Sequence, residues 1–110
     1  MNYNEMSNFS NEELSMFSHL ELQLKTLEEI SDSLSREEQF IPTEISDRIN
    51  SSSNRLIPKY TGKIITLPDV IHVGRVILCS YSQHTGKATE LSIFISTFDD
   101  LVQFFFRKKE

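Results

Sequence analysis

Residues 70–97 decide the fold, and they read VIHVGRVILCSYSQHTGKATELSIFIST. Val, Ile and Leu dominate residues 70–81. In residues 88–97, Leu91, Ile93 and Ile95 alternate with polar side chains. Strict alternation is typical of a strand that has one face in solvent. The stretch therefore predicts two strands.

Between these strands, residues 83–86 are of types that favour a turn. Gly86 suits the left-handed position of a three-residue hairpin loop. This loop places Cys79 opposite Leu91, whereas a two-residue loop shifts the register by one position, and both registers stay open. An antiparallel β-hairpin is thus expected over 70–97.

A helix is expected after the hairpin, capped by residues 97–100 and ending in the basic residues 107–109, which suit the helix dipole. Its apolar side chains span about 200° of the helix surface. A small sheet covers only one side of a helix, so we expect a partner to cover the rest. The predicted partner-binding residues here are Leu101, Phe104, Phe105 and Phe106.

The N-terminal part of the chain predicts a long amphipathic helix. Ser10 and Glu13 form a capping-box pattern, and Phe9 with Leu14 forms a hydrophobic staple. An apolar stripe with coiled-coil-like spacing follows, and its members are predicted to bind a partner: Phe17, Leu20, Leu24, Leu27 and Leu34. The flanking Glu21 and Glu28 would meet no basic residue in a parallel homodimer. The stripe would then pack on a basic partner helix or on the chain's own sheet.

A second, shorter helix is expected from a cap at Thr43, with Ile45 and Ile49 on one face. Residues 50–54 are Ser and Asn, which favour turns, so they are expected to end this helix. The expected fold class is therefore α+β: one or two N-terminal helices, a short antiparallel sheet and a C-terminal helix. Residues 1–9 are a disordered lead-in, 10–58 a helical arm and 59–110 a small hairpin-helix domain, within one folding unit.

Composition excludes several classes of protein. The 110 residues carry a net charge of −5, which argues against a nucleic-acid binder. Residues 1–58 hold 11 acidic and 4 basic side chains, and residues 59–110 hold 5 and 7. No apolar run approaches the roughly 18 residues of a membrane span. The polar N-terminus and the lone cysteine indicate an intracellular protein, cytoplasmic or nuclear.

Few side chains in the sequence are of the types that form catalytic or metal-binding sites. His72 and Cys79 would point to opposite faces of one strand, and Cys79 could approach His84 only across the turn. One Cys and three scattered His, including His19, do not supply a zinc site. Asp99 and Asp100 are explained by helix capping. We therefore expect no enzyme activity, no cofactor, no metal and no small-molecule substrate.

The function expected from these patterns is that of a non-enzymatic protein–protein interaction subunit in an intracellular complex, as a hetero-oligomer or a homodimer. One alternative is a small acidic dimeric chaperone or inhibitor that masks a target. Another is a nucleic-acid-associated subunit, provided that its basic residues gather on one face: Lys59, Lys63, Arg75, Lys87, Arg107, Lys108 and Lys109.

Overall fold

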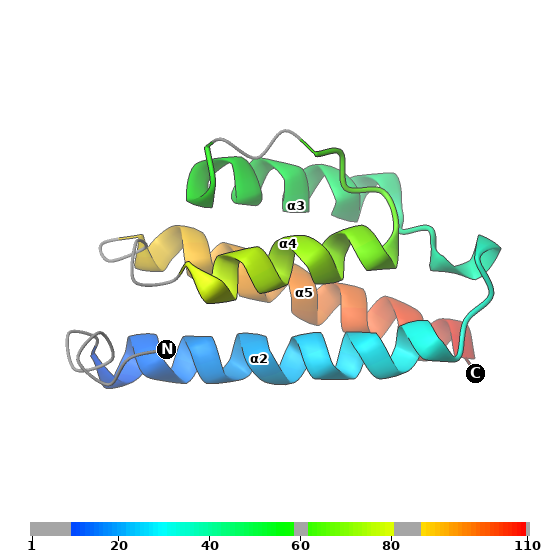
Figure 1. The fold of residues 1–110 in the computed structure, drawn as a ribbon, viewed down its shortest axis with the longest axis horizontal. Coiled ribbons are helices and arrows are strands. Elements are labelled where there is room, and N and C mark those ends of the chain that lie inside the picture. Colours follow the sequence, from blue (N-terminus) through cyan, green and yellow to red (C-terminus); the bar gives the residue numbers. More distant parts are fainter. Residues whose placement is uncertain (1–9, 59–61, 81–86, 110) are drawn as a thin grey trace.

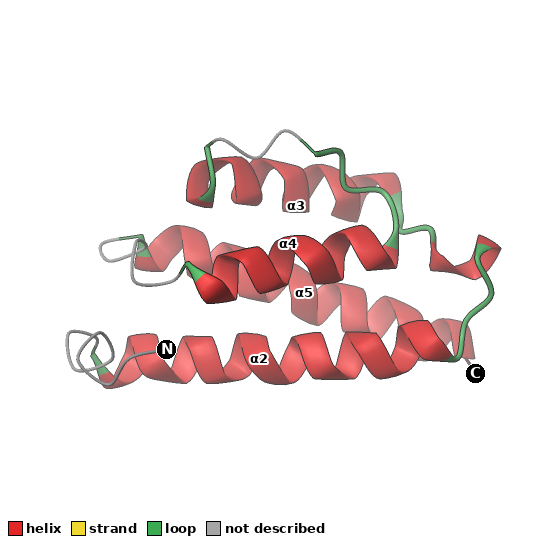
Figure 2. Cartoon of the chain, viewed as in Figure 1, coloured by secondary structure: helices red, strands yellow, loops and turns green. Residues whose placement is uncertain are grey.

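The computed structural model describes residues 10–58, 62–80 and 87–109, and this part of the chain is helical (Figure 2). Its elements are α2 (Asn11–Asp32), the short 3-10 helix η1 (Glu37–Gln39), α3 (Thr43–Leu56), α4 (Leu67–Cys79) and α5 (Ala88–Lys109). The described residues hold no strand, and their β-type pairing is one isolated bridge between Phe40 and Thr66.

The α+β prediction is therefore wrong. The first predicted strand is α4, and the second forms the N-terminal half of α5. Val70, Val73 and Ile77 are buried at helical spacing, because the β-branched residues fill a bundle core here. A strand would have buried Ile93 together with Leu91, yet Ile93 is 45% exposed. The predicted turn at 83–86 lies outside the described residues.

The four helices form an elongated bundle (Figure 1). α2 and α5 run in one direction, and α3 and α4 run in the other. α2 packs on α4 and α5, and α3 packs mainly on α5. The predicted arm and the predicted C-terminal domain therefore contribute to one core. Since α3 and α4 are parallel, the chain must return along the bundle between them (Figure 1).

The described end of this return segment, residues 62–66, is held on α3 by two polar side chains. Ser46 Oγ donates to the Ile64 carbonyl. The Asn50 amide accepts from the Ile64 N–H at 3.3 Å and donates to the Ile64 carbonyl at 3.3 Å. Asn50 thus pairs with the backbone as a neighbouring strand would, and Ile64 is fully buried. Residues 50–54 are therefore part of α3, and the prediction that they end the helix is wrong.

Of the three predicted helix starts, one is confirmed and two are wrong. The capping box at Ser10 is confirmed, with the Glu13 N–H donating to Ser10 Oγ at 3.1 Å. α3 begins after Pro42 without a side-chain cap, so the predicted Thr43 cap is wrong. Residues 97–100 lie inside α5 and cap nothing. Phe9, the first half of the predicted staple, lies outside the described residues.

The core runs through the centre of the bundle and includes a tight contact at Gly74 on α4. Gly74 is buried against Leu24 of α2 and Phe98 of α5. The Phe98 ring also packs on Phe94, with ring centroids 4.4 Å apart. Because Gly74 carries no side chain, the Leu24 side chain and the Phe98 ring can both pack directly against α4 there.

Candidate interaction surface

Most side chains of the two predicted binding stripes lie in the chain's own core. Six are buried: Phe17, Leu20, Leu24, Leu27, Leu101 and Phe105. Leu34 and Phe104 are half-buried and pack against the same cluster. Phe106 is 47% exposed. The stripe of α2 and the aromatic helix therefore meet within one molecule, and of these side chains Phe106 keeps the largest surface open.

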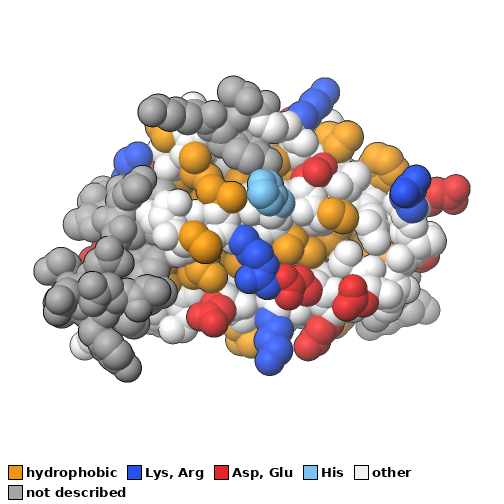
Figure 3. All heavy atoms as spheres, in the orientation of Figure 1, with side chains coloured by type: hydrophobic (Ala, Val, Ile, Leu, Met, Phe, Trp, Pro, Cys, Tyr) orange, Lys and Arg blue, Asp and Glu red, His pale blue; other side chains and the backbone are white. Residues whose placement is uncertain are grey.

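A different apolar surface lies between α2 and α4. These antiparallel helices leave a groove with a cavity volume of about 520 Å³. Its walls include Leu22, Leu24 and Leu78. Leu22 is 63% exposed, more than any other large hydrophobic side chain in the described part of the chain. On the face drawn in Figure 3, apolar side chains alternate with acidic and basic ones.

An ion pair crosses this groove. Arg75 of α4 donates through Nε to Glu28 Oε1 at 2.8 Å, and its Nη2 reaches the same oxygen. Both side chains are more than a third exposed, so the pair adds less than about 1 kcal/mol to stability. The pair also lowers the net charge of the surface where α2 meets α4, because the two charges neutralise each other.

The acidity of the protein is concentrated in α2. This helix holds six acidic side chains and one basic one, Lys25. In each of α3, α4 and α5, acidic and basic side chains are equal in number. The net charge of −5 thus equals that of α2 alone. Four of its carboxylates are exposed: Glu12, Glu21, Glu29 and Asp32.

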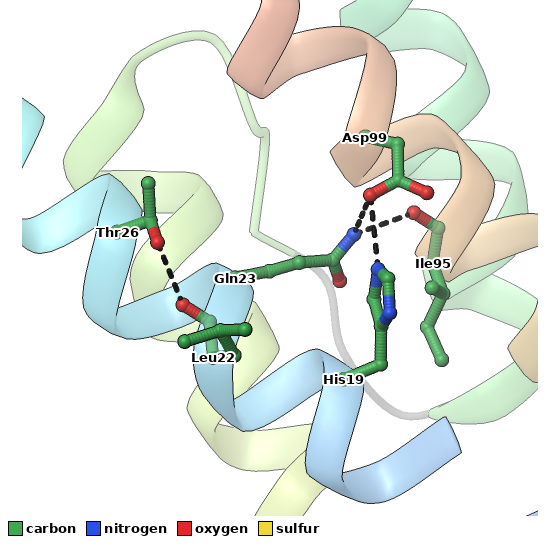
Figure 4. A network of polar contacts seen from close by, with 6 residues as sticks. All are labelled: His19, Leu22, Gln23, Thr26, Ile95 and Asp99. Atoms are coloured by element: carbon green, nitrogen blue, oxygen red, sulfur yellow. Dashed lines mark hydrogen bonds and ion pairs between the residues drawn. The ribbon is translucent and has the colours of Figure 1, made fainter. Parts of the chain in front are cut away.

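A polar cluster joins α2 to α5 on another side of the bundle (Figure 4). Gln23 donates through Nε2 to the Ile95 carbonyl at 2.9 Å and to Asp99 Oδ1 at 2.7 Å. His19 Nε2 lies 3.0 Å from the same Asp99 oxygen. Gln23 is only 5% exposed, and its Oε1 has no hydrogen-bond partner in the described structure.

This cluster bridges two helices, because Asp99 of α5 accepts from Gln23 of α2 and lies within hydrogen-bond distance of His19, which is also on α2. Thr26, which is also drawn in Figure 4, donates to the Leu22 carbonyl of its own helix. The cluster therefore fixes α2 against α5. Asp100, the neighbour of Asp99, bonds instead to Arg48 of α3 at 2.8 Å, so successive carboxylates of α5 bind different helices.

The other predicted reactive groups stay apart. His72 and Cys79 are both exposed on α4. Because α4 is a helix, their separation of seven residues puts them on one face, about 10 Å apart along the axis, and not on opposite faces as a strand would. His84 lies outside the described residues. Within the described ranges, no group of three or more His, Cys, Asp or Glu is arranged to hold a metal ion.

The basic residues of the C-terminal half do not form one patch where the structure describes them. Lys87 and Arg107 lie near opposite ends of α5. Lys87 Nζ donates to the Arg55 carbonyl at 3.1 Å, and Arg75 pairs with Glu28. The side chains of Lys59, Lys108 and Lys109 are outside the described part.

Leu22 was not among the predicted partner-binding residues. The signal was present, since Leu22 is an apolar residue that lies off the buried stripe of the same helix.

Comparisons with protein-family models, curated proteins and solved structures find no match. In the described residues, no helix is long and apolar enough to cross a membrane.

Proposed function

We propose that this protein is a non-enzymatic interaction subunit that holds a partner protein in the groove between α2 and α4. The observation that carries the proposal is the exposure of Leu22 beside a groove of about 520 Å³. A lone exposed leucine needs no explanation, but one that borders a groove with further leucines in its walls is typical of a binding surface.

Because the side chains of the two predicted stripes are mostly buried, we propose this groove as the partner-binding surface instead. Phe105 and the stripe from Phe17 to Leu27 already contact the chain's own core, so a partner would have to unfold the bundle to reach them. Leu22 and Leu78 can be contacted without such a cost. The scattered positions of Lys87, Arg75 and Arg107 lend no support to a nucleic-acid role.

Site-specific photo-crosslinking in the source cells tests the proposal. A photoreactive phenylalanine analogue replaces Leu22 in one variant and Ile93 in a matched control, because Ile93 is also an exposed hydrophobic side chain but lies on α5. We expect a discrete protein adduct from position 22 that is absent from position 93. No adduct from position 22, or equal adducts from both positions, would contradict the proposal.

A further inference from the structure

Several serine and threonine side chains are followed by a carboxylate three positions further on. A protein kinase with a basic substrate groove selects its acceptors by such carboxylates, through charge complementarity. The acceptor hydroxyl must also reach the terminal phosphate of the donor nucleotide in line, so its place in the fold decides whether it can react. Seven residues have this spacing: Ser10, Ser18, Thr26, Ser35, Thr66, Ser96 and Thr97.

Six of these seven residues belong to the α-helices or to their caps. Ser10 and Thr66 are members of the capping boxes that start α2 and α4. A kinase could extend such a residue into its cleft only after part of the bundle had unfolded. The other four lie within α2 or α5: Ser18, Thr26, Ser96 and Thr97.

Ser35 is placed differently, because it lies in the connection between α2 and η1. Ser35 and the three residues that follow it are all exposed. Its backbone N–H donates to Glu38 Oε1 at 3.0 Å. Within the described part of the chain, the Ser35 hydroxyl forms no hydrogen bond, so it is open to reaction.

The segment that follows Ser35 can leave the bundle at little cost. The short helix η1 buries no side chain. The Glu38 N–H donates to the Ser35 carbonyl at 3.1 Å, and the Gln39 N–H donates to the Arg36 carbonyl at 3.4 Å. Segments that have few buried contacts and exposed hydrogen bonds open at low free energy. Residues 35–38 can therefore extend into a kinase cleft while the four α-helices stay packed.

The charges beside Ser35 indicate the class of kinase. Glu37 and Glu38 stand at the second and third positions after it, and Arg36 stands between. Residues 29–38 hold four acidic side chains and one basic side chain, and no basic residue lies between positions 29 and 35. A kinase that reads Lys or Arg before its acceptor therefore finds none, whereas a basic groove is attracted to the two glutamates.

We propose that Ser35 is a phosphorylation site for a serine kinase that selects carboxylates on the C-terminal side of its acceptor. Ser35 Oγ attacks the γ-phosphorus of a nucleoside triphosphate and forms a phosphoester bond. The bond from that phosphorus to the β-phosphate oxygen breaks, the nucleoside diphosphate leaves, and the hydroxyl proton passes to the catalytic base of the kinase. The phosphate adds a charge of about −1.5 to −2 to the connection between α2 and α3.

Phosphorylation of the folded full chain tests the inference. The protein is incubated with ATP and a purified serine kinase of this acidic-directed class, and peptide mass spectrometry locates and quantifies the phosphate. We expect phosphate at Ser35 at a rate at least about tenfold above that at Ser10, which has the same acidic residues after it. Phosphate chiefly at Ser10, or none on the folded chain, would overturn the inference.

Variants separate recognition of this site from general attraction by charge. Ser35→Ala should remove most of the phosphate and leave the circular dichroism spectrum unchanged, because the side chain is exposed. Glu38→Gln should slow phosphorylation about five- to tenfold, whereas Glu29→Gln, which removes the same charge from α2, should not slow it. Equal rates for the two glutamine variants would contradict recognition of the carboxylate after Ser35.

Peptide mapping of the protein isolated from its source cells asks whether the site is used. The cells are lysed with phosphatase inhibitors, and a matched sample is treated with a phosphatase. We expect phosphate at Ser35 in the first sample and its loss in the second. Unmodified Ser35 in both samples would overturn the inference, and it would leave the proposal for the groove between α2 and α4 unaffected.

Discussion

A methyl group on Cα of Gly74 would lie 2.5 Å from Cδ2 of Leu24. The Phe98 ring closes the other side, with its nearest carbon 3.1 Å from the same position. Both neighbours are buried, so neither can move without displacing the core around it. The Leu24 and Phe98 side chains therefore occupy the space that a side chain at position 74 would need.

Gly74→Ala should lower the free energy of unfolding. Alanine gains about 1 kcal/mol of helix propensity over glycine, but overpacking costs about 1–3 kcal/mol and outweighs that gain at this contact. Urea unfolding measures the difference. Adding Leu24→Ala should relieve part of the clash, so the double variant should lose less stability than the sum of the two single changes. Strict additivity would contradict a direct clash.

Asn50→Ala should destabilise the protein by about 1–3 kcal/mol, because the Ile64 N–H loses its partner in a buried segment, whereas the Ile64 carbonyl keeps its bond from Ser46 Oγ. Amide hydrogen exchange at Ile64 should accelerate. Asn54→Ala is the matched control: Asn54 lies one turn further along α3 and is exposed, so its replacement should have little effect. Unchanged exchange at Ile64 in the Asn50 variant would show that the side chain does not hold the return segment.

Gln23→Leu should leave stability unchanged or raise it. The substitution removes a buried oxygen that lacks a partner, and it keeps the volume of the side chain. Asp99 remains about half exposed, so water can replace the lost donor. Gln23→Ala, which leaves a cavity, should instead cost about 1–3 kcal/mol. A loss of more than about 2 kcal/mol for Gln23→Leu would mean that the hydrogen bonds to Ile95 and Asp99 dominate.

Phe105 and Phe106 should respond differently to the same substitution. Phe105→Gln buries a polar side chain in the core and should cost about 3–5 kcal/mol. Phe106→Gln changes a side chain that is about half exposed, and its effect should stay below about 1 kcal/mol. Thermal unfolding followed by circular dichroism compares the two. Equal losses would place the boundary of the core elsewhere on α5.

The sequence was sufficient to predict that helices occupy the first half of the chain, although not the cap and end of α3. The capping box at Ser10 and the apolar stripe of α2 are local signals, and both agree with the final packing. The apolar positions Ile45 and Ile49 similarly indicated α3. In these segments, local preference and tertiary context lead to the same structure.

The prediction for the second half of the chain was wrong because two periodicities overlap in its sequence. Leu91, Ile93 and Ile95 alternate like a strand, but Leu91, Phe98 and Phe105 recur every seven residues and form the buried face of α5. The β-branched residues of this segment favour strands, so the prediction followed the strand period and not the helical one. A local helix signal also precedes this segment: Thr66 and Asp69 form a capping box that starts α4.

The surface was harder to predict than the fold. A stripe of leucines indicates equally a core and an interface, and only the positions of α4 and α5 show that the stripe is internal. Leu22 is informative for the opposite reason, since it interrupts the polar face of α2. The groove beside it depends on Leu78, which is 56 positions away, so no local pattern could reveal it.

The pairing of α2 with α5 also determines when the protein can fold. His19 and Asp99, which join these helices, are 80 positions apart in the chain. During synthesis α2 leaves the ribosome first, but the helices that cover its apolar stripe are made last. At about 5–20 residues per second, that stripe stays uncovered for several seconds. The apolar stripe of α2 therefore gains its full cover only after α5 has left the ribosome.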